Sequence, residues 1–278
     1  RVLFRSPTSV VATDQGSGRA YNNGSASVAF SPGTVPGSTY TVTSSPGSYT
    51  ATGSSSPITV TGQQSSTQYT YTVTSSSVYG TSSASSASSA VTATTAPATP
   101  SAPTATNVTN IAYGASPQAS VAFTAPATGG STITGYAVTS SGGHTNTGSS
   151  SPIVVTGGTA GTAYTYTVTA TNANGTSTAS SASASLTAAT APNVPTSVSA
   201  SDTGIDGEAL ISWTTPAQTG GSAITDYVVQ YSSNSGSSWT TFSDGTSTTT
   251  STTVTGLTLS TAYIFRVAAV NAIGTGSY

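Results

Sequence analysis

Large apolar residues and small polar residues alternate in several short segments of the chain. In residues 164–168, Tyr, Tyr and Val occupy every second position, and Thr fills the positions between them. This period of two predicts a β-strand that buries one face and exposes the other. Clusters of Gly, Pro, Asn and Ser separate such segments, and no stretch repeats with the period of a helix. The pattern therefore predicts an all-β protein built from short strands.

The strand patterns return at intervals the size of a domain. Tyr69, Tyr164 and Tyr263 begin equivalent segments, and they lie 95 and 99 residues apart. A repeat of this length marks whole domains rather than solenoid units. About seven short strands per repeat, with turn residues between them, indicate β-sandwiches. The expected units are domain 1 (6–96), domain 2 (97–193) and domain 3 (194–278), preceded by a short segment at 1–5.

Each repeat resembles a fibronectin type III domain of the bacterial or phage kind. Domain 2 has a Gly-Gly-Ser loop leading into a strand at 129–136, and domain 3 repeats this loop at 220–227. Domain 1 lacks the loop and is the most divergent. The resemblance implies an immunoglobulin-like β-sandwich for each domain, with a structural tyrosine corner whose hydroxyl returns to nearby backbone at Tyr69, Tyr164 and Tyr263. It implies little about function, because such modules serve as spacers, adhesins and fibre segments.

The two ends of the chain do not match the repeat. Domains 1 and 2 close with segments at 90–94 and 186–190, which we expect to form the last strand of each sandwich, strand G. Domain 3 reaches Tyr278 without such a segment. Residues 1–5, in contrast, stand where the strand G of a preceding domain would be.

Two interpretations of these ends stay open. Either the chain is an excerpt from a longer repeat protein, or residues 1–5 of one copy complete domain 3 of the next copy. Donation of this kind would place Val2 and Phe4 in the core and would join copies head to tail into a homopolymer filament. The expected polymerisation interface consists of Arg1, Val2, Leu3, Phe4 and Arg5.

Charge is scarce and unevenly placed. Only 4% of the residues are charged and the net charge is −2, which offers no basic surface and argues against nucleic acid as a partner. Arg1, Arg5 and Arg19 lie near the start, whereas five of the six acidic residues lie in domain 3, and this polarity suits head-to-tail contact. Cys is absent, which excludes disulfides and thiolate metal sites. No apolar run reaches the ~18–20 residues of a membrane span.

Residues that carry chemistry are too few to form an active site. His144 is the only histidine, and domain 2 contains no acidic residue that would orient it as a base. The three acids within 202–208 match no calcium-binding loop, so we interpret them as a solvated turn. Trp239 and Phe242 would suit an aromatic platform for sugars, but packing against the sheet is the simpler expectation. We therefore expect no enzyme activity, no cofactor and no metal.

Three asparagines match the N-glycosylation pattern Asn-x-Ser/Thr: Asn23, Asn107 and Asn174. Such matches also arise by chance in a chain this rich in Ser and Thr. Surface glycans are the second possible partner besides further copies of the chain, because sugar would hydrate a surface short of charge.

The leading hypothesis is a structural subunit of an extracellular, pilus-like filament that polymerises head to tail by β-strand complementation. Two alternatives stay open. One is a phage virion or tail-fibre segment, or an adhesin stalk, and the other is a spacer or carbohydrate-binding module of a secreted polysaccharide-degrading enzyme. All of them place the chain outside the cell, at a cell or virion surface.

Overall fold

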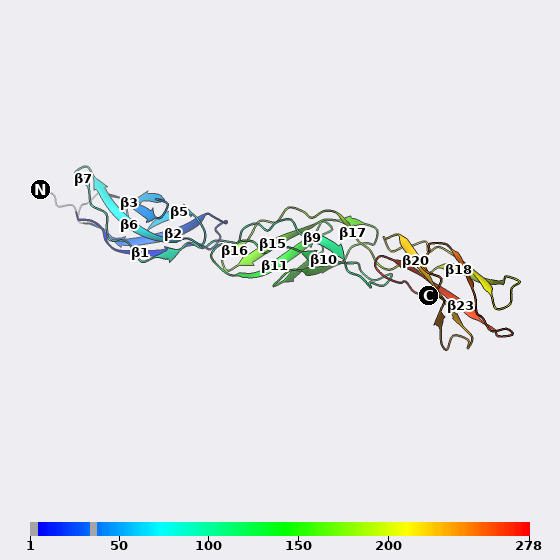
Figure 1. Ribbon diagram of the computed structural model, residues 1–278. Helices are drawn as coiled ribbons and strands as arrows, with labels where there is room; N and C mark the ends of the chain where they lie inside the picture. The colour runs from blue at the N-terminus through cyan, green and yellow to red at the C-terminus, as the bar shows by residue number, and fades with distance from the viewer. Residues whose placement is uncertain (1–4, 34–37) are drawn as a thin grey trace.

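The computed structural model describes residues 5–33 and 38–278, and Figure 1 shows three β-sandwiches in a row. Within these residues every strand pair is antiparallel and there is no helix, hence none that could cross a membrane. The all-β, immunoglobulin-like fold class is therefore confirmed. Each sandwich has its own apolar core, and the three cores are separate.

Domain 1 packs one sheet of order β1-β2-β5 against a second sheet of order β4-β3-β6-β7, with β8 paired to β6. Its strands are β1 (Thr8–Asp14), β2 (Gly24–Ser31), β3 (Thr39–Ser45), β4 (Thr50–Gly53), β5 (Ile58–Gln63), β6 (Gln68–Ser77), β7 (Gly80–Thr81) and β8 (Val91–Thr92).

Domain 2 repeats this plan, with sheets of order β13-β10-β9 and β12-β11-β15-β16 and a short pair β14-β17. Its strands are β9 (Thr104–Asn107), β10 (Gln118–Ala122), β11 (Ile133–Ser140), β12 (Thr145–Gly148), β13 (Ile153–Thr156), β14 (Ala163–Tyr164), β15 (Tyr166–Asn172), β16 (Gly175–Thr176) and β17 (Leu186–Thr187).

Domain 3 has sheets of order β18-β19-β22 and β21-β20-β23. Its strands are β18 (Thr196–Asp202), β19 (Ala209–Thr214), β20 (Ile224–Ser232), β21 (Thr240–Thr241), β22 (Ser251–Val254) and β23 (Ile264–Asn271). After β23 the chain returns only as far as Gly276, whose N–H donates to the carbonyl of Ala269. No described residue continues along the rest of that edge, where β8 and β17 complete domains 1 and 2.

Strand β6 shows how the period of two produces the core. Tyr69, Tyr71 and Val73 are at most 2% exposed, whereas the Thr residues between them are only half-buried. Burial of each large apolar side chain contributes about 1.5–3 kcal/mol to folding. A slip of one residue would exchange the two faces, so this alternation also fixes the register of the strand.

The expected last strand, strand G, is shorter in the structure than the predicted ranges 90–94 and 186–190. Only Val91–Thr92 and Leu186–Thr187 pair as strands. The segments before them follow β6 and β15 with a period of three, through Ser82, Ser85 and Ser88 in domain 1 and Ser177, Ser180 and Ser183 in domain 2.

Each of these serines bonds twice to the strand beside it. The N–H of Ser180 donates to the carbonyl of Val168 at 2.9 Å, and the Val168 N–H donates back to Ser180 Oγ at 3.0 Å. The serine hydroxyl therefore replaces the backbone carbonyl that a regular strand would offer. We call these six residues the serine ladder.

Candidate functional site

The junction between domains 1 and 2 is held by a buried asparagine at the end of β15. Asn172 Nδ2 donates to the carbonyls of Thr95 and Thr128, both at 2.8 Å. Thr95 belongs to the connection from domain 1, and its N–H donates to the carbonyl of Gly129 at 2.8 Å. The connection is thus bonded on both of its edges by domain 2.

The junction between domains 2 and 3 repeats this arrangement. Asn271 Nδ2, at the end of β23, donates to the carbonyls of Thr190 and Thr219, both at 2.8 Å. The Thr190 N–H donates to the carbonyl of Gly220 at 2.8 Å. We call each set of an asparagine, a Gly-Gly loop and a threonine of the preceding connection a junction clasp.

Glycine is required in both clasps because two backbones approach closely. Gly129 has φ +71°, and a Cβ there would lie 2.4 Å from the carbonyl oxygen of Ala96. Gly220 has φ +76°, and its Cβ would lie 2.2 Å from the carbonyl oxygen of Thr190. The Gly-Gly-Ser loops singled out in the sequence therefore form the cradle for the preceding domain.

A second set of backbone bonds links the turns of neighbouring domains. Gly18 N–H donates to the carbonyl of Asn174 at 2.8 Å, and Asn110 N–H donates to the carbonyl of Ile273 at 2.7 Å. In each case the first turn of one domain meets the turn after the asparagine of the next. Ile273, whose carbonyl accepts the second of these bonds, is only 5% exposed.

Among the described residues, domain 1 has a different arrangement at the end that points away from domain 2: a Cβ on Gly33 would lie 2.2 Å from the carbonyl oxygen of Arg5, but the clasp asparagine is replaced. Ser77 pairs with Gly80 as Asn172 pairs with Gly175, so Ser77 stands in the position of the asparagine. The next two residues, Val78 and Tyr79, are 93% and 69% exposed. Sequence reasoning missed the clasp, although Thr-Ala-Pro at 95–97 and 190–192 and Asn at 172 and 271 were visible signals.

The three tyrosines expected to form corners make equivalent bonds. The hydroxyls of Tyr69, Tyr164 and Tyr263 each accept a hydrogen bond of 3.0–3.1 Å from the N–H five residues earlier. These bonds fix the loop that precedes each tyrosine, next to the place where strand G enters.

The three possible glycosylation sites differ in access. Asn23 is exposed. Asn107 Nδ2 donates to the carbonyl of Thr187 at 2.9 Å and its Oδ1 is buried. Asn174 Nδ2 donates to the Thr95 carbonyl in the clasp at 3.3 Å. Because Nδ2 is the atom that would carry the sugar, only Asn23 offers it without breaking such a contact.

The residues considered for chemistry remain dispersed. His144 lies edge-on to Tyr164 with ring centroids 6.0 Å apart. In the described part of the chain no three His, Cys, Asp or Glu residues gather as metal ligands. Trp239 stacks on the guanidinium of Arg266 at 4.0 Å and is not a free platform.

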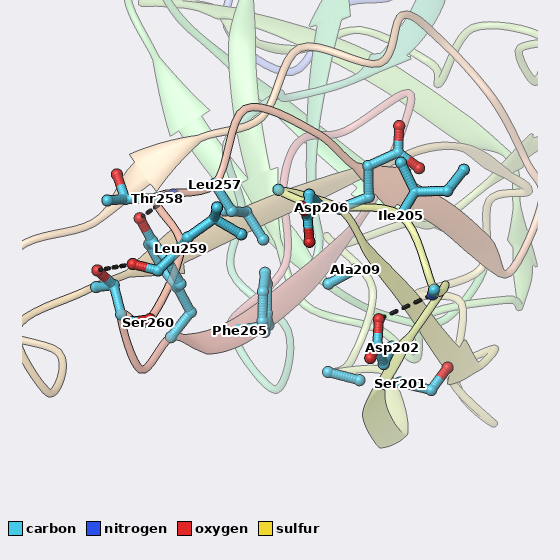
Figure 2. A pocket seen from close by; sticks show the side chains of 16 residues that line it. Ser201, Asp202, Ile205, Asp206, Ala209, Leu257, Thr258, Leu259, Ser260 and Phe265 are labelled. Carbon is cyan, nitrogen blue, oxygen red and sulfur yellow. Dashed lines mark hydrogen bonds between the residues drawn. The ribbon is translucent and has the colours of Figure 1, made fainter.

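Domain 3 has a groove at the end that faces away from domain 2, with a volume of about 510 Å³. Figure 2 shows its two walls, the turn around Asp202 and Asp206 and the loop around Leu257 and Leu259. In domains 1 and 2 the equivalent position is occupied by the end of strand G.

Two backbone bonds show this: Ala93 N–H donates to the carbonyl of Thr67 in domain 1, and Ala188 N–H donates to the carbonyl of Thr162 in domain 2, both at 2.9 Å. Thr261 is the equivalent residue in the groove, two positions before Tyr263.

Of the expected polymerisation interface, Arg1, Val2, Leu3 and Phe4 lie outside the described residues, and Arg5 is exposed. Residues 1–5 were expected to stand in the position of a preceding strand G, but the pairing of the first strands aligns them with the connection that follows strand G. Ala12, Ala105 and Ala200 pair with Val28, Val121 and Ile211, and each stands five residues after a proline. Counted from those prolines, residues 1–5 correspond to the connections 94–98 and 189–193, which follow strand G.

A family model for the fibronectin type III domain matches residues 101–186 and 193–278. Among solved structures, the chain is similar to the FN1–FN3 domains of chicken CNTN1, with 19% identity, a TM-score of 0.42, and coverage of 98% of this chain and 95% of that one. A tandem-domain segment of titin gives 17% identity, a TM-score of 0.40 and coverage of 97% and 96%. The titin kinase with its flanking domains gives 34% identity over 31% of this chain and 15% of that one, with a TM-score of 0.29.

Proposed function

The chain belongs to the fibronectin type III family, and from this premise we propose that it is a structural subunit of an extracellular filament. Tandem domains of this family are typically non-catalytic structural or adhesive modules. The observation that carries the proposal is the repeated junction clasp, in which Asn172 and Asn271 hold the preceding connection in the same way. A connection that is bonded on both edges resists bending, so the row of domains acts as a stiff spacer.

The scarcity of charge supports a role in a dense fibre. Domain 2 contains no charged residue, and the net charge of the whole chain is −2. A net charge near zero leaves little repulsion to keep copies apart. The exposed strand faces carry Thr and Ser hydroxyls instead, which stay hydrated without charge.

Strand complementation is the finer part of the proposal, and the groove of domain 3 supports it. Ser260 N–H and the Thr261 carbonyl occupy the positions that bind Ala93 in domain 1 and Ala188 in domain 2. An extended segment laid in this groove would form the same pair of bonds. Asp202, Asp206 and Glu208 lie along it, so a segment that carries arginine suits its charge.

Residues 1–5 of a second copy fit this groove only after a shift in register. For Val2 to take the place of Val91, the segment moves four residues relative to the internal connections. Two residues, Arg5 and Ser6, would then join the donated strand to Pro7, where six residues (94–99) join Ala93 to Pro100. A connection this short cannot enter a clasp, and domain 1 has Ser77 instead of the clasp asparagine.

Electron microscopy and sedimentation of the purified chain test the proposal. We expect the 278-residue chain to form filaments one domain wide, and a variant that lacks residues 1–5 to stay monomeric. A variant with Val11→Ser, which changes an exposed residue on β1, serves as the control. Filaments formed equally by the truncated chain would refute strand donation while leaving the filament role in place. Monomers at every concentration would refute the filament role itself.

A further inference from the structure

The outer end of domain 1 carries two exposed apolar side chains at a position that is a contact elsewhere in the molecule. Val78 and Tyr79 are 93% and 69% exposed. In domain 3 the residue equivalent to Tyr79 is Ile273, which is 5% exposed and accepts a bond from the first turn of domain 2 through its carbonyl. In domain 2 the equivalent is Asn174, which accepts from Gly18. We call Val78 and Tyr79 the upper patch.

The outer end of domain 3 carries a corresponding pair. Ile205 in the first turn and Leu259 in the loop before Tyr263 are each 60% exposed, and both line the groove in Figure 2. The residue equivalent to Leu259 in domain 1 is Ser65, whose hydroxyl bonds to Thr95 of the connection at 2.7 Å. We call Ile205 and Leu259 the lower patch.

The two patches therefore occupy positions that lie on opposite sides of each junction between neighbouring domains. At those positions the internal junctions have mostly small or polar residues. Apolar groups grouped at a contact position indicate a surface that is covered in the assembled state. Charge agrees with this pairing, because Arg5 lies at the upper end and Asp202, Asp206 and Glu208 lie at the lower end.

We propose that the upper patch of one copy packs against the lower patch of a second copy, in the same relative order as two neighbouring domains within the chain. The proposal rests on the filament function above and names its contact, and it does not depend on which segment fills the groove. The contact is heterologous, since the two patches differ, so it propagates instead of closing into a dimer.

Two single substitutions test this contact. Val78→Glu places an acid against the acidic lower end, and Leu259→Glu adds a fourth acid there. We expect each variant alone to associate at least about tenfold more weakly than the unchanged chain, as measured by sedimentation equilibrium. Val78→Lys, at the same exposed position, should associate more strongly than Val78→Glu because it faces opposite charge. Val11→Glu, on the side of domain 1, should leave association unchanged.

Mixing the two variants gives the sharper result. A copy with Val78→Glu keeps a normal lower patch, and a copy with Leu259→Glu keeps a normal upper patch. Their mixture should form one-to-one complexes and nothing longer, because only one pair of intact patches remains. Circular dichroism checks that both variants are folded. Filaments of normal length from either variant alone would overturn the contact while leaving the filament function intact, whereas an unchanged chain that never associates would overturn both.

Discussion

Asn172 donates from Nδ2 to the carbonyl oxygen of Thr95 at 2.8 Å, across 77 residues of sequence and from one domain to the connection of another. The same side chain bonds within its own domain to Thr128. It is 5% exposed, so the carbonyls it serves have no easy replacement in water. One side chain thereby makes the orientation of domain 1 depend on the fold of domain 2.

Replacing Asn172 with Ala should loosen this junction. The two carbonyls would lose a buried donor, at a cost of about 1–3 kcal/mol. Because the chain has no Cys, spin labels on Val11→Cys and Ser181→Cys, both at exposed positions, would report the distance between domains 1 and 2. We expect a broader distance distribution in the Asn172→Ala variant.

Asn146→Ala is the matched control for this experiment. Asn146 is exposed, and its Nδ2 donates to the carbonyl of Val154 within domain 2. Its loss should leave the inter-domain distances unchanged. Equal distributions for both variants would mean that Asn172 does not hold the junction.

Gly129→Ala should disturb the same junction by a different route. Its Cβ would come within 2.4 Å of the Ala96 carbonyl oxygen, so the connection must move. Gly143→Ala separates this effect from backbone strain, since Gly143 has φ +82° and open space around its Cβ. Both variants should lose about 1–2 kcal/mol of domain stability from the left-handed conformation. Only Gly129→Ala should also broaden the distances between domains, and a junction undisturbed by it would contradict the steric argument.

The parts of the fold that follow from local pattern could be predicted from the sequence. Alternation at Tyr69, Tyr71 and Val73 predicted which faces are buried, and the resemblance of the repeats to fibronectin type III domains predicted the family that the family model shows. These signals depend on neighbours two positions away, which a single sequence displays directly.

The clasp and the serine ladder were not predicted, because the role of each residue depends on partners far away in the sequence; for the clasp, only the recurrence of Thr-Ala-Pro and Asn in both repeats pointed to it. In the sequence Asn172 looks like an ordinary turn residue, and its role is visible only in the structure, where it donates to the carbonyl of Thr95. Ser180 is polar and appears solvent-facing, yet it is 6% exposed because its hydroxyl occupies a backbone acceptor position. A period of three in a segment of small polar residues leaves no hydrophobic signal for pattern reasoning to detect.

Removing a single rung of the serine ladder should destabilise domain 2. In Ser180→Ala the buried Val168 N–H loses its acceptor, which costs about 1–3 kcal/mol. For a domain of this size, 1 kcal/mol lowers the melting temperature by about 4–8 °C. Ser181→Ala, one position along and exposed, should melt like the unchanged chain. Differential scanning calorimetry measures both, and equal melting curves would show that the ladder bond contributes nothing.

Two tyrosines should ionise at different pH values, although their side chains are chemically identical. Burial raises the pKa of Tyr71, although the bond from Gln63 Nε2 at 2.6 Å opposes part of this rise. Hydrogen bonding from the side chain of Thr258, together with the bond from its backbone N–H, lowers the pKa of Tyr263, which is solvent-accessible. In a titration followed by the NMR shift of labelled tyrosine Cζ, Tyr263 should therefore ionise before Tyr71.

The same shift of Tyr71 makes the stability of domain 1 depend on pH. Its folded pKa lies above the unfolded value of about 10, so the neutral phenol stabilises the fold below that pH. This contribution is lost as the pH rises through the folded pKa. Hydrogen exchange of the Val73 amide in domain 1 should accelerate across this range beyond the general effect of base, and it should do so less in Tyr71→Phe. In Tyr263→Phe the early ionisation in domain 3 should disappear while the Val73 amide behaves as in the unchanged chain. An identical pH response of that amide in Tyr71→Phe and in the unchanged chain would contradict the assignment to Tyr71.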